Sequence, residues 1–250
     1  MSILPAALAL ALSPLTFGAV QSTERDRAEA QRHYETGQSL MRAESFEEAV
    51  REFQAAIALE PLFVLAHYSL GQADMSLKRY PDAIVAYEAC RAALLRYSSL
   101  DLNERAAAER RREDELRGIK DALRLMQQGK VKTSGGGMDA SMLRLEERIR
   151  FLENSRMTGD KSNVAVPADL SLALGSAYFR SGKMQDAERE YRQAIQTDRR
   201  LGSAHNNLAV VYMLTGRLVE ADDSVRAAEK AGFKVSPQLK DDIKKRRVAR

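Results

Sequence analysis

The chain has 250 residues, and its 39 basic and 35 acidic side chains leave a formal net charge of +4. So balanced a surface argues against a protein that binds nucleic acid through bulk charge. The single cysteine excludes an internal disulfide and a cysteine-based metal cluster. Ala, Leu, Arg and Glu dominate the composition, and all four are good helix formers, so an all-α protein is expected.

The first 23 residues carry no charged side chain and are mostly apolar and small. This segment is similar to a secretory signal peptide, with cleavage expected before Ala19. Pro5 and Pro14 interrupt the apolar stretch, so an uncleaved membrane anchor and an ordinary apolar N-terminus remain as alternatives. A cleaved signal predicts an exported, periplasmic or extracellular protein. The alternatives predict a cytoplasmic protein or one anchored in the membrane by its N-terminus.

An internal repeat of 34 residues organises the rest of the chain. Chemically similar side chains recur at this offset in Gly37 and Gly71, Phe46 and Tyr80, Ala49 and Ala83, Phe53 and Tyr87, and Ala56 and Cys90. A later set has the same offset: Leu174 and Leu208, Tyr178 and Tyr212, Gly182 and Gly216, Ala187 and Ala221, and Ala194 and Ala228. Recurrence at one fixed offset predicts stacked copies of a single supersecondary unit.

This pattern resembles the tetratricopeptide-repeat family, which places small residues at positions 8, 20 and 27 of its unit and large ones at 11, 17 and 24. Four repeats fit, at 30–63, 64–97, 168–201 and from 202 onward. The resemblance implies two antiparallel helices per repeat, whose small residues allow close approach and whose large residues fill the facing hollows. The expected fold is a helical solenoid made of two pairs of repeats, in segments 24–97 and 168–235.

Some positions depart from the family pattern. The usual Trp near the start of the first helix is missing, and position 11 of the second repeat is Asp74 instead of a large residue. The Pro at position 32 is replaced by Arg199 in the third repeat and by Phe233 in the fourth. After the fourth repeat, Ser236 and Pro237 are good starting residues for a helix. We expect segment 236–250 to be a polar capping helix with a basic tail.

Residues 98–167 do not fit the repeat, and we expect them to form a helical insertion. One charged helix is expected from about Asp101 to Gln128, then a flexible glycine-rich loop, and then a second helix over 139–154. In the second helix the spacing of Met142, Leu145, Ile149 and Leu152 predicts a short coiled-coil seam. The two helices are expected to form a hairpin, with pairing of 139–154 to a second copy of the chain as the alternative. Two isolated repeats would bury too small a core. We therefore expect the hairpin to dock on the repeats, or the two repeat pairs to touch.

No catalytic or metal-binding pattern emerges from the sequence. His33, His67 and His205 each hold position 4 of a repeat, which spaces them too widely for one metal ion. Cys90 holds a small-residue position and is expected to be an inert core residue. The glycine-rich loop lacks the Lys and Ser/Thr of a phosphate-binding loop. The expectation is a protein with no enzymatic activity and no cofactor.

In the tetratricopeptide-repeat family the first helix of each repeat lines a concave groove, and the resemblance implies that this groove binds a peptide or helix of another protein. The groove residues so implied are Gln31, Tyr34, Gln38, Met41, Tyr68, Gln72, Met75, Phe179, Asn206, Asn207, Val210 and Met213. Met and Tyr suit an adaptable binding face. Asn207 lies where some family members hold a peptide backbone, whereas the Lys and Arg pattern that clamps acidic chaperone tails is absent.

The leading hypothesis is therefore a protein-interaction scaffold, with no small-molecule substrate and no nucleic-acid partner. Contact with a membrane is expected only through an uncleaved N-terminal segment. One alternative is a structural or assembly component of the cell envelope that self-associates through 139–154. A further alternative is an accessory subunit of an enzyme. The repeat pattern is highly specific for fold and weakly specific for function.

Overall fold

The computed structural model describes residues 22–97, 102–128, 138–154 and 166–248. Nearly all of the expected signal segment, the glycine-rich loop and the last two residues of the basic tail lie outside these ranges. The described residues form eleven helices and no strand, as the all-α prediction requires. None of the helices in these ranges combines the length and the apolar character needed to cross a membrane.

Four helix pairs stand where the sequence predicts the repeats. They are α1 (Glu24–Arg42) with α2 (Phe46–Leu59), α3 (Val64–Ser76) with α4 (Tyr80–Tyr97), α7 (Ala168–Arg180) with α8 (Met184–Thr197), and α9 (Gly202–Leu214) with α10 (Leu218–Lys230). Helix α1 begins six residues before the predicted repeat because Thr23 and Asp26 form a capping box. The Thr23 side chain accepts the Asp26 backbone N–H at 3.1 Å, and the Asp26 carboxylate accepts the Thr23 backbone N–H at 2.9 Å.

Close approach between the two helices of a repeat explains the alternation of small and large residues. A Cβ atom added to Gly37 would lie 2.6 Å from the ring of Phe53, and one added to Gly71 would lie 2.5 Å from the ring of Tyr87. Gly175 has the same relationship to Tyr191, at 2.7 Å. The fourth repeat has Ala209 at the glycine position and Val225 at the aromatic position, so a larger residue on one helix goes with a smaller one on the other.

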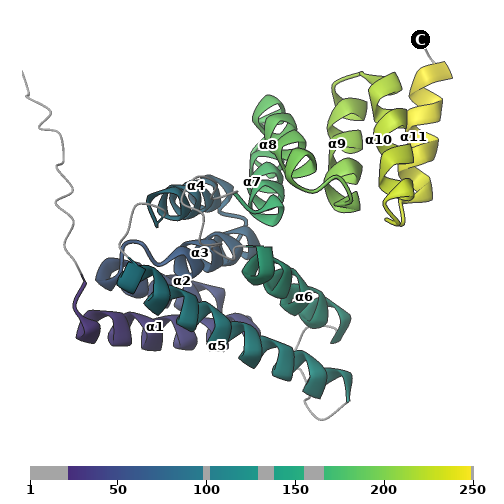
Figure 1. Cartoon of the computed structure of the whole chain (residues 1–250). Helices are drawn as coiled ribbons and strands as arrows, with labels where there is room; N and C mark the ends of the chain where they lie inside the picture. Colours follow the sequence, from purple (N-terminus) through teal and green to yellow (C-terminus); the bar gives the residue numbers. More distant parts are fainter. Residues whose placement is uncertain (1–21, 98–101, 129–137, 155–165, 249–250) are drawn as a thin grey trace, which may run out of the picture.

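The two repeat pairs form one continuous stack, because α4 packs directly against α7. Figure 1 shows the repeats following one another although the insertion separates them in the sequence. Tyr178 donates a hydrogen bond to Glu88, Arg91 pairs with Glu190, and Arg180 Nε lies 3.2 Å from the Tyr80 hydroxyl. One cluster of buried apolar residues runs from Ala30 in α1 to Ile243 near the C-terminus.

The insertion contributes two helices, α5 (Leu102–Gln127) and α6 (Met138–Asn154). They pack against each other, and in Figure 1 they lie beside the first two repeats. Leu116 and Ile119 of α5 and the fully buried Phe151 and Leu152 of α6 join the core of the repeats. Both expected ways of enlarging the core therefore occur: the hairpin docks on the repeats, and the repeat pairs touch.

The expected capping helix is α11 (Pro237–Val248). Leu239 and Ile243 are buried and join the core cluster of the repeats. Lys240 Nζ pairs with Glu229 Oε1 at 2.9 Å. Two residues of the basic stretch also contact the repeats, because Arg247 pairs with Asp222 at 3.1 Å and Arg246 donates to the Met213 carbonyl oxygen at 3.3 Å. These two cations thus help to fasten the cap.

Candidate protein-interaction surface

The concave groove of the first two repeats holds a helix of the chain itself. The ring of Phe151 in α6 stacks on the ring of Tyr68 in α3, with centroids 3.8 Å apart and an interplanar angle of 13°. The guanidinium of Arg148, one turn earlier on α6, lies 5.6 Å from the centroids of both the Tyr34 and Tyr68 rings. Cation–π contacts of this kind strengthen when water is excluded. Tyr34 and Tyr68, which were expected to meet a partner, are only 2% and 3% exposed. Helix α6 therefore lies where the partner was expected.

A buried polar network fixes the same contact. Glu115 of α5 accepts a hydrogen bond from the Tyr34 hydroxyl at 2.6 Å and one from Arg148 Nε at 2.9 Å. The amide of Gln38 donates to the Tyr34 hydroxyl at 3.1 Å and to the Ser69 hydroxyl at 2.8 Å. Gln38 is therefore a linker between the two tyrosine-bearing helices rather than an open binding residue.

Burial shifts both charged groups of this network toward their neutral forms. It raises the pKa of the Glu115 carboxyl, and the charge of Glu35 acts in the same direction. Burial also lowers the pKa of Arg148 to about 9, which leaves the guanidinium charged at neutral pH. One Glu115 oxygen, Oε2, and one Arg148 nitrogen, Nη1, are buried without a hydrogen-bond partner in the described structure. The ion pair is therefore only partly compensated for its loss of water.

The C-terminal end of α6 has two further anchors. Arg112 of α5 donates to the Leu152 carbonyl oxygen at 2.6 Å, which satisfies one of the carbonyls left free at a helix end. Arg150 pairs with Asp169 of α7 at 3.6 Å and so connects the hairpin to the third repeat. Glu115, Arg148 and Phe151 were not among the predicted groove residues. Their signal was weak, because Arg148 and Phe151 lie beside the apolar seam of α6 and not on it.

The rest of the predicted groove is less enclosed. Gln31, Met41, Gln72 and Met75 are half-buried along the first two repeats. On the third and fourth repeats, Phe179, Asn206, Asn207 and Val210 are also half-buried, and the described helices of the insertion, α5 and α6, lie away from α9. Asn207 accepts a hydrogen bond from the Asn206 amide at 3.4 Å. Met213, in contrast, is buried at 8% exposure and packs in the core.

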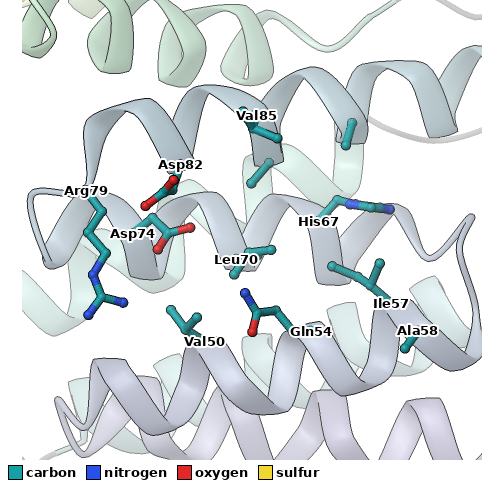
Figure 2. A pocket seen from close by; sticks show the side chains of 12 residues that line it. Val50, Gln54, Ile57, Ala58, His67, Leu70, Asp74, Arg79, Asp82 and Val85 are labelled. Carbon is teal, nitrogen blue, oxygen red and sulfur yellow. The ribbon is translucent and has the colours of Figure 1, made fainter. Parts of the chain in front are cut away.

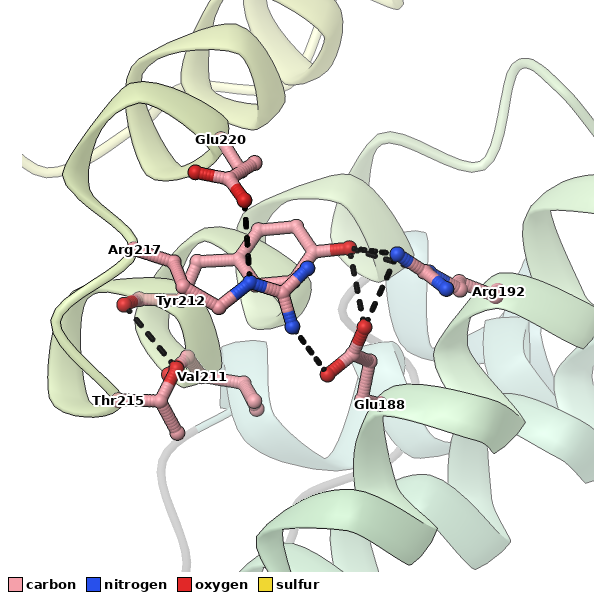
Figure 3. A network of polar contacts seen from close by, with 7 residues as sticks. All are labelled: Glu188, Arg192, Val211, Tyr212, Thr215, Arg217 and Glu220. Carbon is pink, nitrogen blue, oxygen red and sulfur yellow. Dashed lines mark hydrogen bonds and ion pairs between the residues drawn. The ribbon is translucent and has the colours of Figure 1, made fainter.

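A second polar network joins the third repeat to the fourth (Figure 3). The guanidinium of Arg217 lies 4.1 Å from the centroid of the Tyr212 ring and pairs with Glu188 at 2.8 Å and with Glu220 at 3.1 Å. The Tyr212 hydroxyl accepts a hydrogen bond from Arg192 at 2.9 Å. All of these charged groups have partners, so we assign the network to the junction between repeats.

The histidines and the cysteine have structural partners. His33 Nδ1 lies 2.7 Å from Glu52, and the Nε2 atoms of His67 and His205 contact backbone carbonyl oxygens of Pro61 and Arg199 at 2.9 and 3.1 Å. Burial raises the pKa of the Cys90 thiol far above its usual range, so no reactive thiolate forms. Over the described ranges, no three His, Cys, Asp or Glu side chains gather as metal ligands.

A sequence model of the tetratricopeptide repeat matches residues 34–94 and 172–232. These two segments are the two repeat pairs of the stack, and each repeat shows the small and large packing positions of that family. The chain belongs to the tetratricopeptide-repeat family. Proteins of this family are in general interaction scaffolds that bind other proteins rather than enzymes.

Solved structures of other tetratricopeptide-repeat proteins are similar over most of the chain. A thermophilic TPR protein from Thermus thermophilus is 19% identical, with a TM-score of 0.35 over 88% of this chain and 99% of that one. PilF from Pseudomonas aeruginosa is 13% identical, with a TM-score of 0.34 over 84% of this chain and 80% of that one. The TPR2AB domain of yeast Sti1, solved in complex with pHSP90, is 14% identical, with a TM-score of 0.27 over 82% and 91%. Comparison with curated protein sequences gives no significant match.

Proposed function

We propose that this protein is a scaffold that holds a helix of a partner protein on the concave face of its third and fourth repeats. The observation that carries the proposal is the position of α6, which lies on the equivalent face of the first two repeats with Phe151 stacked on Tyr68. The groove formed by these repeats therefore accommodates a helix. Within the described ranges α6 also touches α7, but neither α5 nor α6 covers the next face, on α9.

The chemistry of this open face favours an amphipathic helix over a strongly charged one. Phe179 and Val210 offer apolar contact, and Asn206 and Asn207 offer amide groups that both donate and accept hydrogen bonds. A partner helix would place apolar residues three or four apart against the first two and polar residues against the amides. A helix docked here would lie next to α6, whose Arg150 already pairs with Asp169 of α7.

Site-specific photo-crosslinking in the native cell tests this proposal. A photoreactive amino acid at Val210 should crosslink to one partner protein. The matched control carries the same group at Val219, which is 59% exposed on α10, the second helix of the same repeat. The partner should be absent from the Val219 sample, and Asn206→Arg in the Val210 sample should remove it. Equal crosslinking from both positions, or no crosslink at Val210, would count against the groove.

The same experiment separates the scaffold from the self-association alternative. Crosslinks between two copies of the chain, with a doubled mass in light scattering, would favour an assembly component of the cell envelope. We further infer that the partner is met after export, because the first 23 residues have the composition of a signal peptide. N-terminal sequencing of the native protein tests this, and a retained Met1 would contradict it.

A further inference from the structure

A second hollow lies between α2, α3 and α4, at a site separate from α6 (Figure 2). Its volume is about 480 Å³. Val50 and Ile57 of α2, Leu70 of α3 and Val85 of α4 form apolar walls, and Val85 is 66% exposed at the rim. Pockets of this size with mostly apolar walls and a few polar groups are typical of sites for small organic groups.

The polar group in this pocket is the carboxylate of Asp74. Asp74 is only 4% exposed; within the described ranges its side chain has no hydrogen bond or ion pair, and the nearest compensating charge is the Arg79 guanidinium. Figure 2 shows the carboxylate between α2 and α4, facing the space that Leu70 and Val50 line. The family pattern has a large residue at this position of the repeat, so the acid takes the place of a packing side chain. A buried charge without a partner is unfavourable.

The other charged groups around the pocket leave Asp74 uncompensated. Asp82 on α4 is a like charge, and Arg79, before α4, is the one cation among the lining residues. His67 on α3 stays neutral, because burial lowers its pKa, and α2 contributes only Val50, Gln54, Ile57 and Ala58. Burial and the charge of Asp82 together raise the pKa of Asp74 to about 6, against the opposing effect of Arg79. The carboxylate is therefore ionised at neutral pH.

We propose that this pocket binds an alkylammonium group, that is, a protonated amine carried on an apolar stem. The stem would pack against Val50, Ile57 and Val85 while the ammonium donates hydrogen bonds to the Asp74 carboxylate. Such a charge-assisted hydrogen bond is stronger than one between neutral groups. A free organic amine and a lysine side chain of another protein share this chemistry. The site is independent of the concave face.

Titration of the full chain with n-butylamine, followed by NMR of the backbone amides of Ala86 and Ala89, tests the proposal. At neutral pH the shifts should saturate, with an affinity at least about tenfold higher than that for butan-1-ol, which lacks the charge. The preference should disappear in Asp74→Asn and weaken as the pH falls through about 6. Equal affinity for amine and alcohol in the wild-type chain would overturn the proposal, whatever the variant does.

A second variant guards against misfolding of Asp74→Asn. Val85→Lys places a tethered ammonium at an exposed position on the rim, so it should block n-butylamine while Ala86 and Ala89 keep their folded chemical shifts. Undiminished amine binding in Val85→Lys would contradict the assigned location. Nα-acetyl-lysine methylamide distinguishes the two sources. Asp74-dependent binding of this compound would assign the pocket to a lysine side chain, whereas binding of n-butylamine alone would assign it to a free amine.

Discussion

Phe151 of α6 lies flat against Tyr68 of α3, with ring centroids 3.8 Å apart. Phe151 belongs to the insertion and Tyr68 to the second repeat, so this stack joins the two parts of the chain. Arg148 completes the contact by placing its guanidinium 5.6 Å from the centroids of both Tyr34 and Tyr68. The insertion therefore packs on the first two repeats through α6.

Phe151→Ala is expected to release α6 from the groove. Phe151 is fully buried, and removal of a buried aromatic side chain costs about 3–5 kcal/mol. Hydrogen exchange should accelerate in α6 and at Tyr68, while α9 and α10 keep their protection. Leu143→Ala is the matched control, because Leu143 is 54% exposed on the same helix and its loss should change stability by less than about 0.5 kcal/mol. Unchanged exchange in α6 would show that Phe151 does not hold the hairpin.

The buried pair of Arg148 and Glu115 should be more sensitive to removal of one partner than of both. Arg148→Met leaves Glu115 buried without its cation, which is expected to cost about 3–5 kcal/mol. The double replacement Arg148→Met with Glu115→Leu should recover most of this loss, because it removes two charges that are only partly hydrogen-bonded. Urea unfolding of the wild type, Arg148→Met, Glu115→Leu and the double variant measures the coupling. Additive losses would mean that the two side chains act independently.

The close approach of Gly71 to the ring of Tyr87 predicts that a larger residue at 71 can be tolerated if residue 87 becomes smaller. Gly71→Ala would bring a Cβ to 2.5 Å from the ring of Tyr87 and is expected to cost about 1–3 kcal/mol. The fourth repeat has Ala209 and Val225 at the equivalent positions, so Tyr87→Val should relieve the clash in the double variant. Thermal unfolding should then show that Tyr87→Val lowers the stability less in the Gly71→Ala background than in the wild-type chain. A double variant with the summed loss of the two single ones would refute this explanation.

The fold could be predicted from the sequence because the small and large residues that pack together lie within one repeat. Gly37 and Phe53 lie on neighbouring helices, and their sizes are matched within one unit, so the spacing alone reveals the contact. Arg148 and Tyr34 are 114 residues apart and belong to different structural units. Nothing in the spacing of α6 indicates which of its faces meets the repeats. Tyr34 and Tyr68 could be named as groove candidates from the repeat positions alone, whereas their contact with the chain's own α6 became visible only in the structure.

The turn between the two helices of a repeat contains a residue with positive φ, and replacing it by glycine in the second repeat is expected to increase stability slightly. The third and fourth repeats have Gly182 and Gly216 there, both with φ of 79°, whereas the second has Lys78 with φ of 59°. This left-handed conformation is unfavourable for residues with a Cβ, so Lys78→Gly should stabilise the fold by about 1 kcal/mol. The matched reverse change, Gly182→Ala, should destabilise by a similar amount. Chemical denaturation of both variants provides the measurement, and a loss in Lys78→Gly would contradict the account.

The raised pKa of Asp74 should make the free energy of unfolding depend on pH, and a neutral side chain at this position should remove that dependence. Its folded pKa of about 6 lies above the ordinary value of 3.8, so the folded state binds the proton more tightly than the unfolded state does. The resulting stabilisation is fully present below the unfolded pKa and is lost as the pH rises through about 6. Asp74→Leu restores the large residue of the family pattern and should raise the free energy of unfolding by about 1–3 kcal/mol at neutral pH.

The advantage of Asp74→Leu over the wild-type chain should shrink by about 1–2 kcal/mol when the pH falls from 7 to 4. Urea unfolding of the two proteins at a series of pH values measures this difference, and effects common to other carboxylates cancel in the comparison. Asp82→Asn is the control, because Asp82 is exposed and its loss should lower the pKa of Asp74 slightly without removing the titration. A difference between wild type and Asp74→Leu that stays constant with pH would mean that Asp74 does not titrate in this range.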